Sequence, residues 1–164
     1  MQTEMYPEQI KRPSPYSKEN IARAAKKHSV ELAQQWSDWT AEEWEESLIR
    51  HYRPHLNGYE LAKEMERDGY SPDAEMVNEL DTFDHYVSSC GREAEKEWVK
   101  LVGFNPEFSV GDDVDLGERF KDRGQYGKVS RIRHESAEYE VKVDAASNSA
   151  FIIKAENLKA HAAK

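Results

Sequence analysis

The chain has 164 residues and a formal net charge of −9, and Asp, Glu, Lys and Arg make up 34% of it. This length suits one domain or two small ones. A single cysteine, Cys90, excludes an internal disulfide, and no apolar run approaches the roughly 18 to 20 residues that span a bilayer. The N-terminal residues lack the apolar core of a signal peptide, so the sequence favours a cytoplasmic protein.

The charge is unevenly distributed along the chain. Residues 1–30 carry a net charge of +3, residues 31–107 carry −12, and residues 108–164 are neutral. A strongly acidic segment repels nucleic acid and attracts basic surfaces. The middle of the chain therefore has the strongest electrostatic preference for a partner.

The first predicted elements are an arm and a helix. Residues 1–16 place three prolines among polar residues, which predicts a flexible, extended arm. Ser17 is a good N-cap residue, and apolar residues follow it at helical spacing. A first helix is therefore expected to begin after Ser17.

Two shorter helices are expected next. Thr40 and Glu43 have the spacing of a capping box, which predicts a second helix, and Pro54 ends it. Asn57 predicts the start of a third helix, and Gly69 is a natural stop.

A long apolar stripe follows these helices. Ser71 and Pro72 predict an N-cap with proline at the first helical position. Apolar residues then recur every three or four positions to about Val102, as one helix or as two joined near Gly91. The sequence thus predicts an acidic helical domain of about four helices over residues 17–105.

The last third of the chain changes to the two-residue period of β-strands. Val129 and Ile132 break strict alternation in one expected strand, which predicts a bulge or a strong bend. Residues 156–158 indicate a short helical turn. The expected strands lie at 114–116, 127–132, 139–143 and 151–153.

The motifs VGDDV, YGKVSRI, EYEVKVD and AFIIKAENL follow one another in this segment. Their order is similar to that of SH3-like barrels of the KOW and Tudor-like kind, over about residues 108–160. The resemblance implies an α+β protein, in which the helical domain precedes a small SH3-like β-barrel. Such barrels bind nucleic acid, proteins or peptides, so the resemblance implies a fold more than a function. The helical part resembles, in style only, accessory proteins of bacteriophages and plasmids.

Motifs of common enzymes are missing from the sequence. It contains no P-loop, no dinucleotide-binding glycine fingerprint, no G-x-S-x-G elbow and no H-E-x-x-H helix. His51 and His55 have a metal-binding spacing, but Pro54 interrupts their helix. Cys90 falls on an apolar stripe, which favours a buried thiol. The sequence therefore predicts a protein that is not an enzyme and has no catalytic residues, metal site or cofactor.

A basic cluster precedes and enters the second expected strand. Residues 117–133 carry a local charge of +4 with aromatic rings between the cations, which is the composition of a nucleic-acid surface. An ordinary mixed-charge surface, or docking of this loop on the acidic helices, explains the same pattern. The candidate nucleic-acid-binding residues are Arg119, Lys121, Arg123, Tyr126, Lys128, Arg131 and Arg133.

The acidic helices are the second candidate surface. They predict a partner protein, and the alternative is a phage-type inhibitor whose carboxylates imitate DNA and block a host nucleic-acid enzyme. The four tryptophans have helical spacing that fits core packing, with an exposed protein-binding patch as the alternative. The sequence gives no indication of oligomeric state. The candidate protein-binding residues are Glu42, Glu43, Glu45, Glu46, Glu64 and Glu66.

Overall fold

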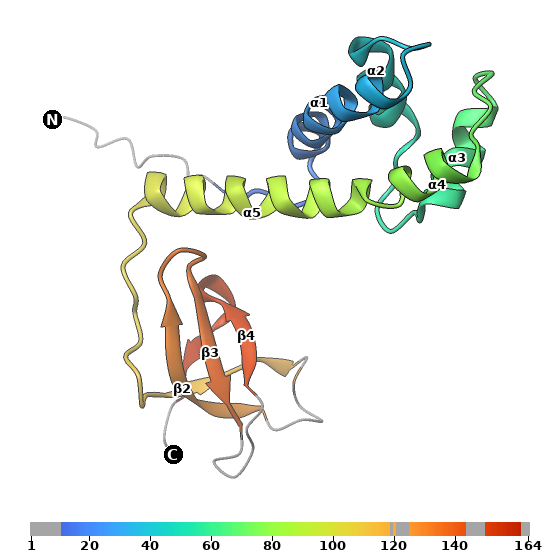
Figure 1. The fold of residues 1–164 in the computed structure, drawn as a ribbon. Coiled ribbons are helices and arrows are strands. Elements are labelled where there is room, and N and C mark those ends of the chain that lie inside the picture. Colours follow the sequence, from blue (N-terminus) through green and yellow to red (C-terminus); the bar gives the residue numbers. More distant parts are fainter. Residues whose placement is uncertain (1–10, 119, 121–124, 144–149, 162–164) are drawn as a thin grey trace, which may run out of the picture. The chain divides into compact units, whose positions relative to one another are not determined.

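The computed structural model describes residues 11–118, 120, 125–143 and 150–161 (Figure 1). The chain is α+β, with helices first and a five-stranded antiparallel sheet after them. It divides into two compact units, Met1–Glu95 and Lys96–Lys164, which we call the helical unit and the sheet unit. Within the described residues, no helix is both long enough and apolar enough to cross a membrane.

Five α-helices precede the sheet in the described part of the chain. Figure 1 shows α1 beside α2, and α3 beside α4. The boundary between the two units falls inside the last helix, α5. The helices are α1 (Lys18–Gln35), α2 (Ala41–His51), α3 (Gly58–Glu66), α4 (Ala74–Leu80) and α5 (Phe83–Val102).

The predicted N-caps of the first three helices are confirmed. The Ser17 side chain accepts a hydrogen bond from the Asn20 backbone at the start of α1. Thr40 and Glu43 form the reciprocal capping box of α2, and Asn57 forms a second one at α3. Each such cap satisfies backbone N–H groups that a helix end leaves unpaired.

The long apolar stripe is two helices, and the predicted start and joint are both wrong. Asp73, rather than the Ser71–Pro72 pair, caps α4 by accepting from the Met76 backbone. The helices separate after Leu80, where Asp81 accepts a 2.7 Å hydrogen bond from the Gly58 backbone. A Cβ on Gly58 would lie 2.2 Å from the Val77 carbonyl oxygen, so the start of α3 fits at this joint only without a side chain.

Gly91 lies inside α5 and does not interrupt it. A Cβ at this position would lie 2.9 Å from the Cα of Pro15. The glycine therefore permits close approach of the segment before α1. Arg12 of the same segment forms an ion pair with Glu95 of α5.

The core of the helical unit is built on aromatic residues. Trp44 and Phe83 are fully buried, and Trp36 and Trp39 pack against the core from partly exposed positions. The Trp39 ring stacks on Tyr70 with a centroid distance of 4.0 Å. Core packing thus accounts for the buried Trp44, whereas Trp39 keeps part of its surface exposed.

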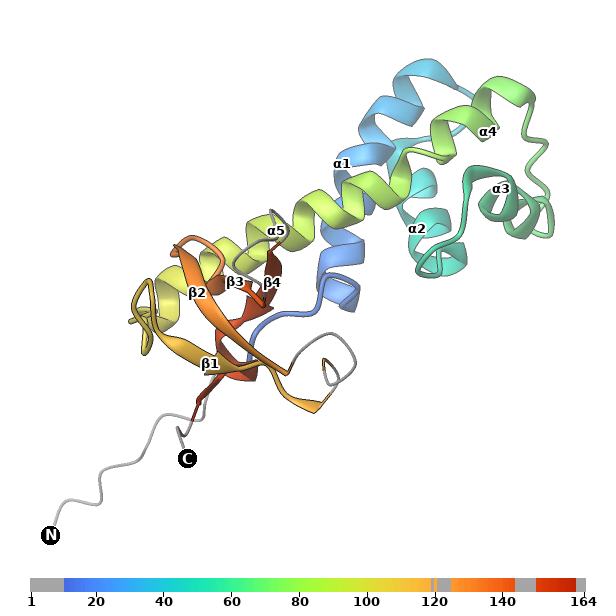
Figure 2. The ribbon, with the colours of Figure 1, turned by 90° about the horizontal axis from the view of Figure 1, so that it is seen from below.

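The sheet unit has the strand order β4-β3-β2-β1-β5. The 3-10 turn Ala155–Asn157 falls where the sequence predicts a helical turn, and a fifth strand that the sequence did not predict follows it. β5 pairs with β1, which is labelled beside β2 in Figure 2. The strands are β1 (Asp113–Asp115), β2 (Tyr126–Arg133), β3 (Glu138–Lys142), β4 (Phe151–Lys154) and β5 (Lys159–Ala160).

The predicted bulge in β2 is confirmed. The pairing of β2 with β3 shifts between Val129 and Arg131, so Ser130 has no partner residue on β3. The extra residue places both Val129 and Ile132 toward the core, opposite Val141 and Tyr139. A bulge of this kind corrects the alternation of a strand whose apolar residues are three apart.

Candidate binding surfaces

The outer face of β2 and β3 carries charges of both signs. Arg133 lies 3.2 Å from the Glu138 carboxylate, and Arg131 lies 3.7 Å from Glu140. Lys128 lies 2.8 Å from Asp113 on β1, and its hydrogen bond holds the pKa of that carboxyl below its usual value. Each of these three cations therefore has a carboxylate beside it, which lowers its capacity to attract phosphate.

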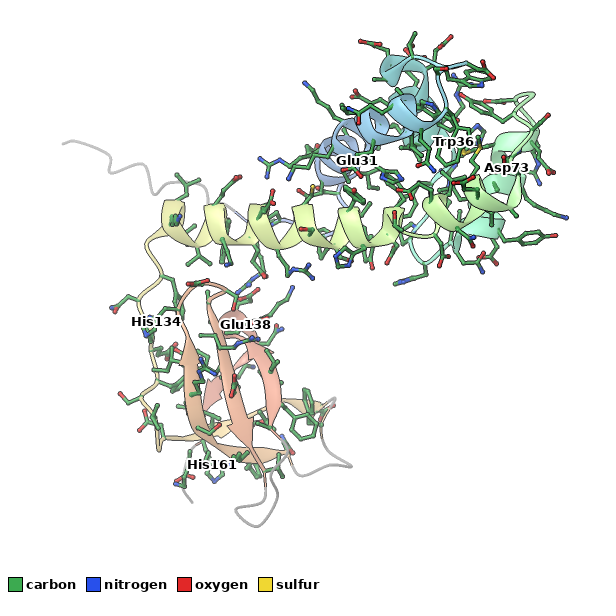
Figure 3. All side chains as sticks on the ribbon, viewed as in Figure 1. Glu31, Trp36, Asp73, His134, Glu138 and His161 are labelled. Carbon is green, nitrogen blue, oxygen red and sulfur yellow. The ribbon has the colours of Figure 1, made fainter. Side chains whose placement is uncertain are left out.

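The seven candidate nucleic-acid-binding residues do not form one described surface. Arg119, Lys121 and Arg123 lie outside the described residues. Figure 3 shows Glu138, the partner of Arg133, and His161 at opposite ends of the sheet. The Tyr126 ring lies against His161, at 4.1 Å between centroids.

A hollow of about 830 Å³ lies at the His161 end of the sheet, and we call it the sheet groove. Two of the candidates, Tyr126 and Lys128, line it, and Tyr126 is 48% exposed. Its other lining residues include Val110, Lys142 and His161. Lys142 was not among the candidates predicted from the sequence, although the register of the β2–β3 hairpin places it opposite Lys128.

A second hollow, of about 180 Å³, lies beside α2, and we call it the α2 hollow. The stacked rings of Trp39 and Tyr70 form one part of its wall. The Ser47 side chain also lines it, and the Ser47 hydroxyl is buried with no hydrogen-bond partner among the described residues. The remaining lining residues are Glu43, Glu46, Arg50 and Asp68.

The charged groups of the α2 hollow differ in how they are bound. Asp68 forms a hydrogen bond of 2.8 Å with His51 and accepts one of 2.7 Å from Arg50, and these bonds lower the pKa of its carboxyl. Glu43 bonds the Thr40 backbone through the capping box. Glu46 has no hydrogen-bond or ion-pair partner among the described residues.

Two of the six candidate protein-binding glutamates, Glu43 and Glu46, meet in this hollow. Glu64 instead forms an ion pair of 2.7 Å with Arg67. The other three do not line the hollow. They are Glu42, Glu45 and Glu66.

His51 and His55 do not form a shared site. His51 bonds Asp68, whereas His55 has a backbone φ of 71° and places its ring against Tyr16. Cys90 is a buried free thiol, as its position on the apolar stripe predicts.

A fully buried histidine that the sequence analysis missed, His28, lies on α1. Its Nδ1 is 4.0 Å from the Glu79 carboxylate, and its ring packs against Tyr86 at 4.5 Å between centroids. Burial lowers the pKa of His28 to about 4, so the imidazole is neutral near pH 7. Tyr86 donates a 2.6 Å hydrogen bond to Glu31, which raises the pKa of the tyrosine to about 12.

No family model matches the chain, and the searches of curated proteins and of solved structures return no match. The surfaces themselves are therefore the basis for a functional proposal. They differ in chemistry. The α2 hollow is aromatic and acidic, the sheet groove is aromatic and basic, and His28 is a buried imidazole beside carboxylates.

Proposed function

We propose that the chain is a non-enzymatic interaction module whose helical unit binds a basic segment of a partner protein at the α2 hollow. The observation that carries this proposal is the combination of stacked Trp39 and Tyr70 rings with the carboxylate of Glu46. Aromatic faces attract cations, and a nearby carboxylate adds a charged hydrogen-bond acceptor. A volume of about 180 Å³ is below the range of small-molecule sites, and it suits one side chain.

The charges of the hollow and of the segment around it support the same proposal. An arginine or lysine that enters the hollow brings N–H donors to the Glu46 carboxylate. The net charge of −12 over residues 31–107 would also speed the approach of a basic partner.

The test uses the full chain and a fluorescently labelled peptide of alternating arginine and glycine. Binding is followed by anisotropy at low salt, with a peptide of citrulline and glycine as the uncharged probe. Glu46→Gln should weaken binding about tenfold or more, because hydrogen bonds to charged groups contribute about 1.5–3 kcal/mol. Glu42→Gln removes the same charge from α2 outside the hollow and should change the affinity little.

Equal losses in the two variants would contradict the α2 hollow as the site. Equal binding of the arginine and citrulline peptides would contradict a basic partner.

The DNA-mimicking inhibitor remains the alternative form of this proposal. The carboxylates of Glu42, Glu45 and Glu66 support it, since none of them has a hydrogen-bond or ion-pair partner among the described residues. In that case the partner is a nucleic-acid enzyme, and its basic groove is the surface that is bound. Duplex DNA should then displace the chain from its partner protein, because both occupy the same basic groove. It should not displace the chain from a partner that lacks such a groove.

For the sheet unit, we propose an SH3-like barrel of the KOW or Tudor-like kind. The strand order β4-β3-β2-β1-β5 and the 3-10 turn before β5 support it, together with a core on one face of the sheet. Val114, Val129 and Val141 are fully buried on that face or nearly so.

A second candidate function is contact with single-stranded nucleic acid at the sheet groove. The half-exposed Tyr126, whose ring is tilted by 46° against His161, offers a surface for a base, and Lys142 adds a cation beside it. Base–aromatic stacking contributes about 1–3 kcal/mol per base. The groove's volume of about 830 Å³ leaves room for such a base.

Fluorescence anisotropy with labelled oligo(dT) at low salt tests this second function. Tyr126→Ala should lower the affinity at least about fivefold, given the stacking energy of about 1–3 kcal/mol. Arg133→Gln, at the far end of the sheet, should have the smaller effect. No binding by the unaltered chain at low salt would remove the nucleic-acid component and leave the helical proposal intact.

A further inference from the structure

The imidazole of His28 lies in the helical unit with both ring nitrogens unsatisfied. The residue is 0% exposed, and neither Nδ1 nor Nε2 has a hydrogen-bond partner among the described residues. Its neighbours within reach are carboxylates, since ligand atoms of His28, Glu31 and Glu79 lie within 4.8 Å of one another. A buried polar group that points into a pair of carboxylates calls for a ligand that all three can share.

We propose that His28, Glu31 and Glu79 form a binding site for a divalent transition-metal ion of the Zn²⁺ class. A four-coordinate ion with bonds of about 2.0–2.2 Å holds its ligand atoms about 3.4 Å apart. His28 Nδ1 and the Glu79 carboxylate are 4.0 Å apart, so small side-chain rotations bring them to that spacing.

The ligand set selects the class of ion. One imidazole nitrogen with two carboxylates suits Zn²⁺ and its first-row neighbours, whereas Mg²⁺ and Ca²⁺ prefer sites of oxygen alone. The two carboxylate charges balance the charge of a dication. A neutral imidazole is the form that coordinates metal, through either of its ring nitrogens.

Three helices of the helical unit place these groups. His28 and Glu31 are three residues apart on α1, so they lie on one face of that helix, and Figure 3 labels Glu31 there. Glu79 comes from α4, and Tyr86 comes from α5. Tyr86 donates to Glu31 and packs on the His28 ring, so it orients two ligands at once.

The site lies at the edge of the core. His28 is fully buried, the Glu79 side chain is 30% exposed, and Glu31 is exposed. An ion can therefore enter from the carboxylate side without opening the core. Bound there, it would connect α1 to α4 and stabilise the folded helical unit by mass action.

The test uses the full chain after treatment with EDTA and removal of the chelator. Thermal unfolding is measured with Zn²⁺, and Co²⁺ is titrated while its visible absorption is recorded, since protein ligands change that absorption. We expect Zn²⁺ to raise Tm and Co²⁺ to bind with one ion per chain. Mg²⁺ at the same concentration should leave Tm unchanged.

Two substitutions at partly exposed ligands keep the test independent of folding. Glu79→Gln and Glu31→Gln should each weaken Co²⁺ binding at least about tenfold, since each removes one charged ligand. Glu75→Gln is the matched control, because Glu75 lies one turn earlier on α4 and contacts Gln35 at 3.2 Å. This control should bind Co²⁺ as the unaltered chain does.

Two outcomes would overturn the metal site. One is the absence of both a Tm shift and a Co²⁺ spectrum in the unaltered chain. The other is binding that Glu79→Gln and Glu31→Gln change no more than Glu75→Gln does, which would place the ion elsewhere on the surface. Neither outcome bears on the α2 hollow, whose residues are different.

Discussion

The helical unit and the sheet unit treat their charges in opposite ways. On the outer face of the sheet, Lys128, Arg131 and Arg133 each lie beside a carboxylate of a neighbouring strand. On α2, the carboxylates of Glu42, Glu45 and Glu46 have no cation beside them among the described residues. A local excess of charge in the sequence is therefore no measure of an available surface. Strand pairing brings opposite charges together from distant residues, whereas the start of a helix stabilises carboxylates without cations.

The largest expected effect is a loss of stability in the helical unit, and it tests the close packing at Gly58. Gly58→Ala should destabilise it by about 3 kcal/mol, because the new Cβ would lie 2.2 Å from the backbone oxygen of Val77. Urea unfolding followed by tryptophan fluorescence measures this change. Gly91→Ala is the control, since its Cβ meets Pro15 in the turn before α1 and alanine favours the helix by about 1 kcal/mol. A loss in Gly91→Ala as large as that in Gly58→Ala would disprove the close packing of α3 on the joint between α4 and α5.

The second prediction removes the neutralising charge from the sheet. Glu140 lies 3.7 Å from Arg131, so Glu140→Gln should release this arginine, whereas Arg133 keeps its ion pair with Glu138. Affinity for labelled oligo(dT) at low salt should rise about threefold to tenfold, because the released arginine can neutralise a phosphate of the oligonucleotide. The salt dependence of binding should become steeper for the same reason. Glu107→Gln removes the same charge outside these strands and should have a smaller effect. An unchanged salt dependence in Glu140→Gln would show that the ion pairs do not limit the basic surface.

The third prediction compares two serines, one in each unit. Ser47 has an unsatisfied buried hydroxyl, so Ser47→Ala should stabilise the helical unit by about 1 kcal/mol. Ser130 donates a 3.0 Å hydrogen bond to the Glu140 carbonyl oxygen, so Ser130→Ala should cost the sheet unit about 1 kcal/mol. Thermal unfolding gives both values. Effects of the same sign in the two units would be inconsistent with the assigned hydrogen bonding.

The smallest effect concerns two aspartates at low pH. A hydrogen bond with His51 lowers the pKa of Asp68, and one from Arg50 adds a smaller decrease. A hydrogen bond from Lys128 lowers the pKa of Asp113. Their stabilisation is present above the unfolded-state value of about 3.9, and it is lost as pH falls through the lower folded value. Carboxyl ¹³C NMR titration should give midpoints below about 3.9 for both residues. A midpoint at the ordinary value would indicate that the ion pair is open in solution.

Local features of the fold were predictable from the sequence, whereas features that depend on tertiary contacts were not. The capping boxes at Thr40 and Asn57 involve residues three apart, so the sequence contains all that they need. The joint after Leu80 depends on a bond from Gly58 to Asp81, which are 23 residues apart. β5 has only two residues, too few to show a period.

The candidate surfaces were harder to predict for the same reason. The α2 hollow needs Tyr70 against Trp39, and no periodicity within α2 indicates that contact. His28 and Glu31 have a helical spacing that the sequence shows, but their meeting with Glu79 depends on how α1 and α4 pack. The ion pairs of Arg131 and Arg133 were easier to predict from the sequence, since the hairpin register places Glu140 and Glu138 opposite them.

The bulge at Ser130 has a consequence for comparing this chain with others. A strand without this residue would alternate regularly, and it would keep Val129 opposite Val141 and Ile132 opposite Tyr139. A chain one residue shorter at this position could thus build the same core with the same neighbours. An alignment that forbids a gap inside β2 would shift every later side chain to the wrong face and conceal such a relative.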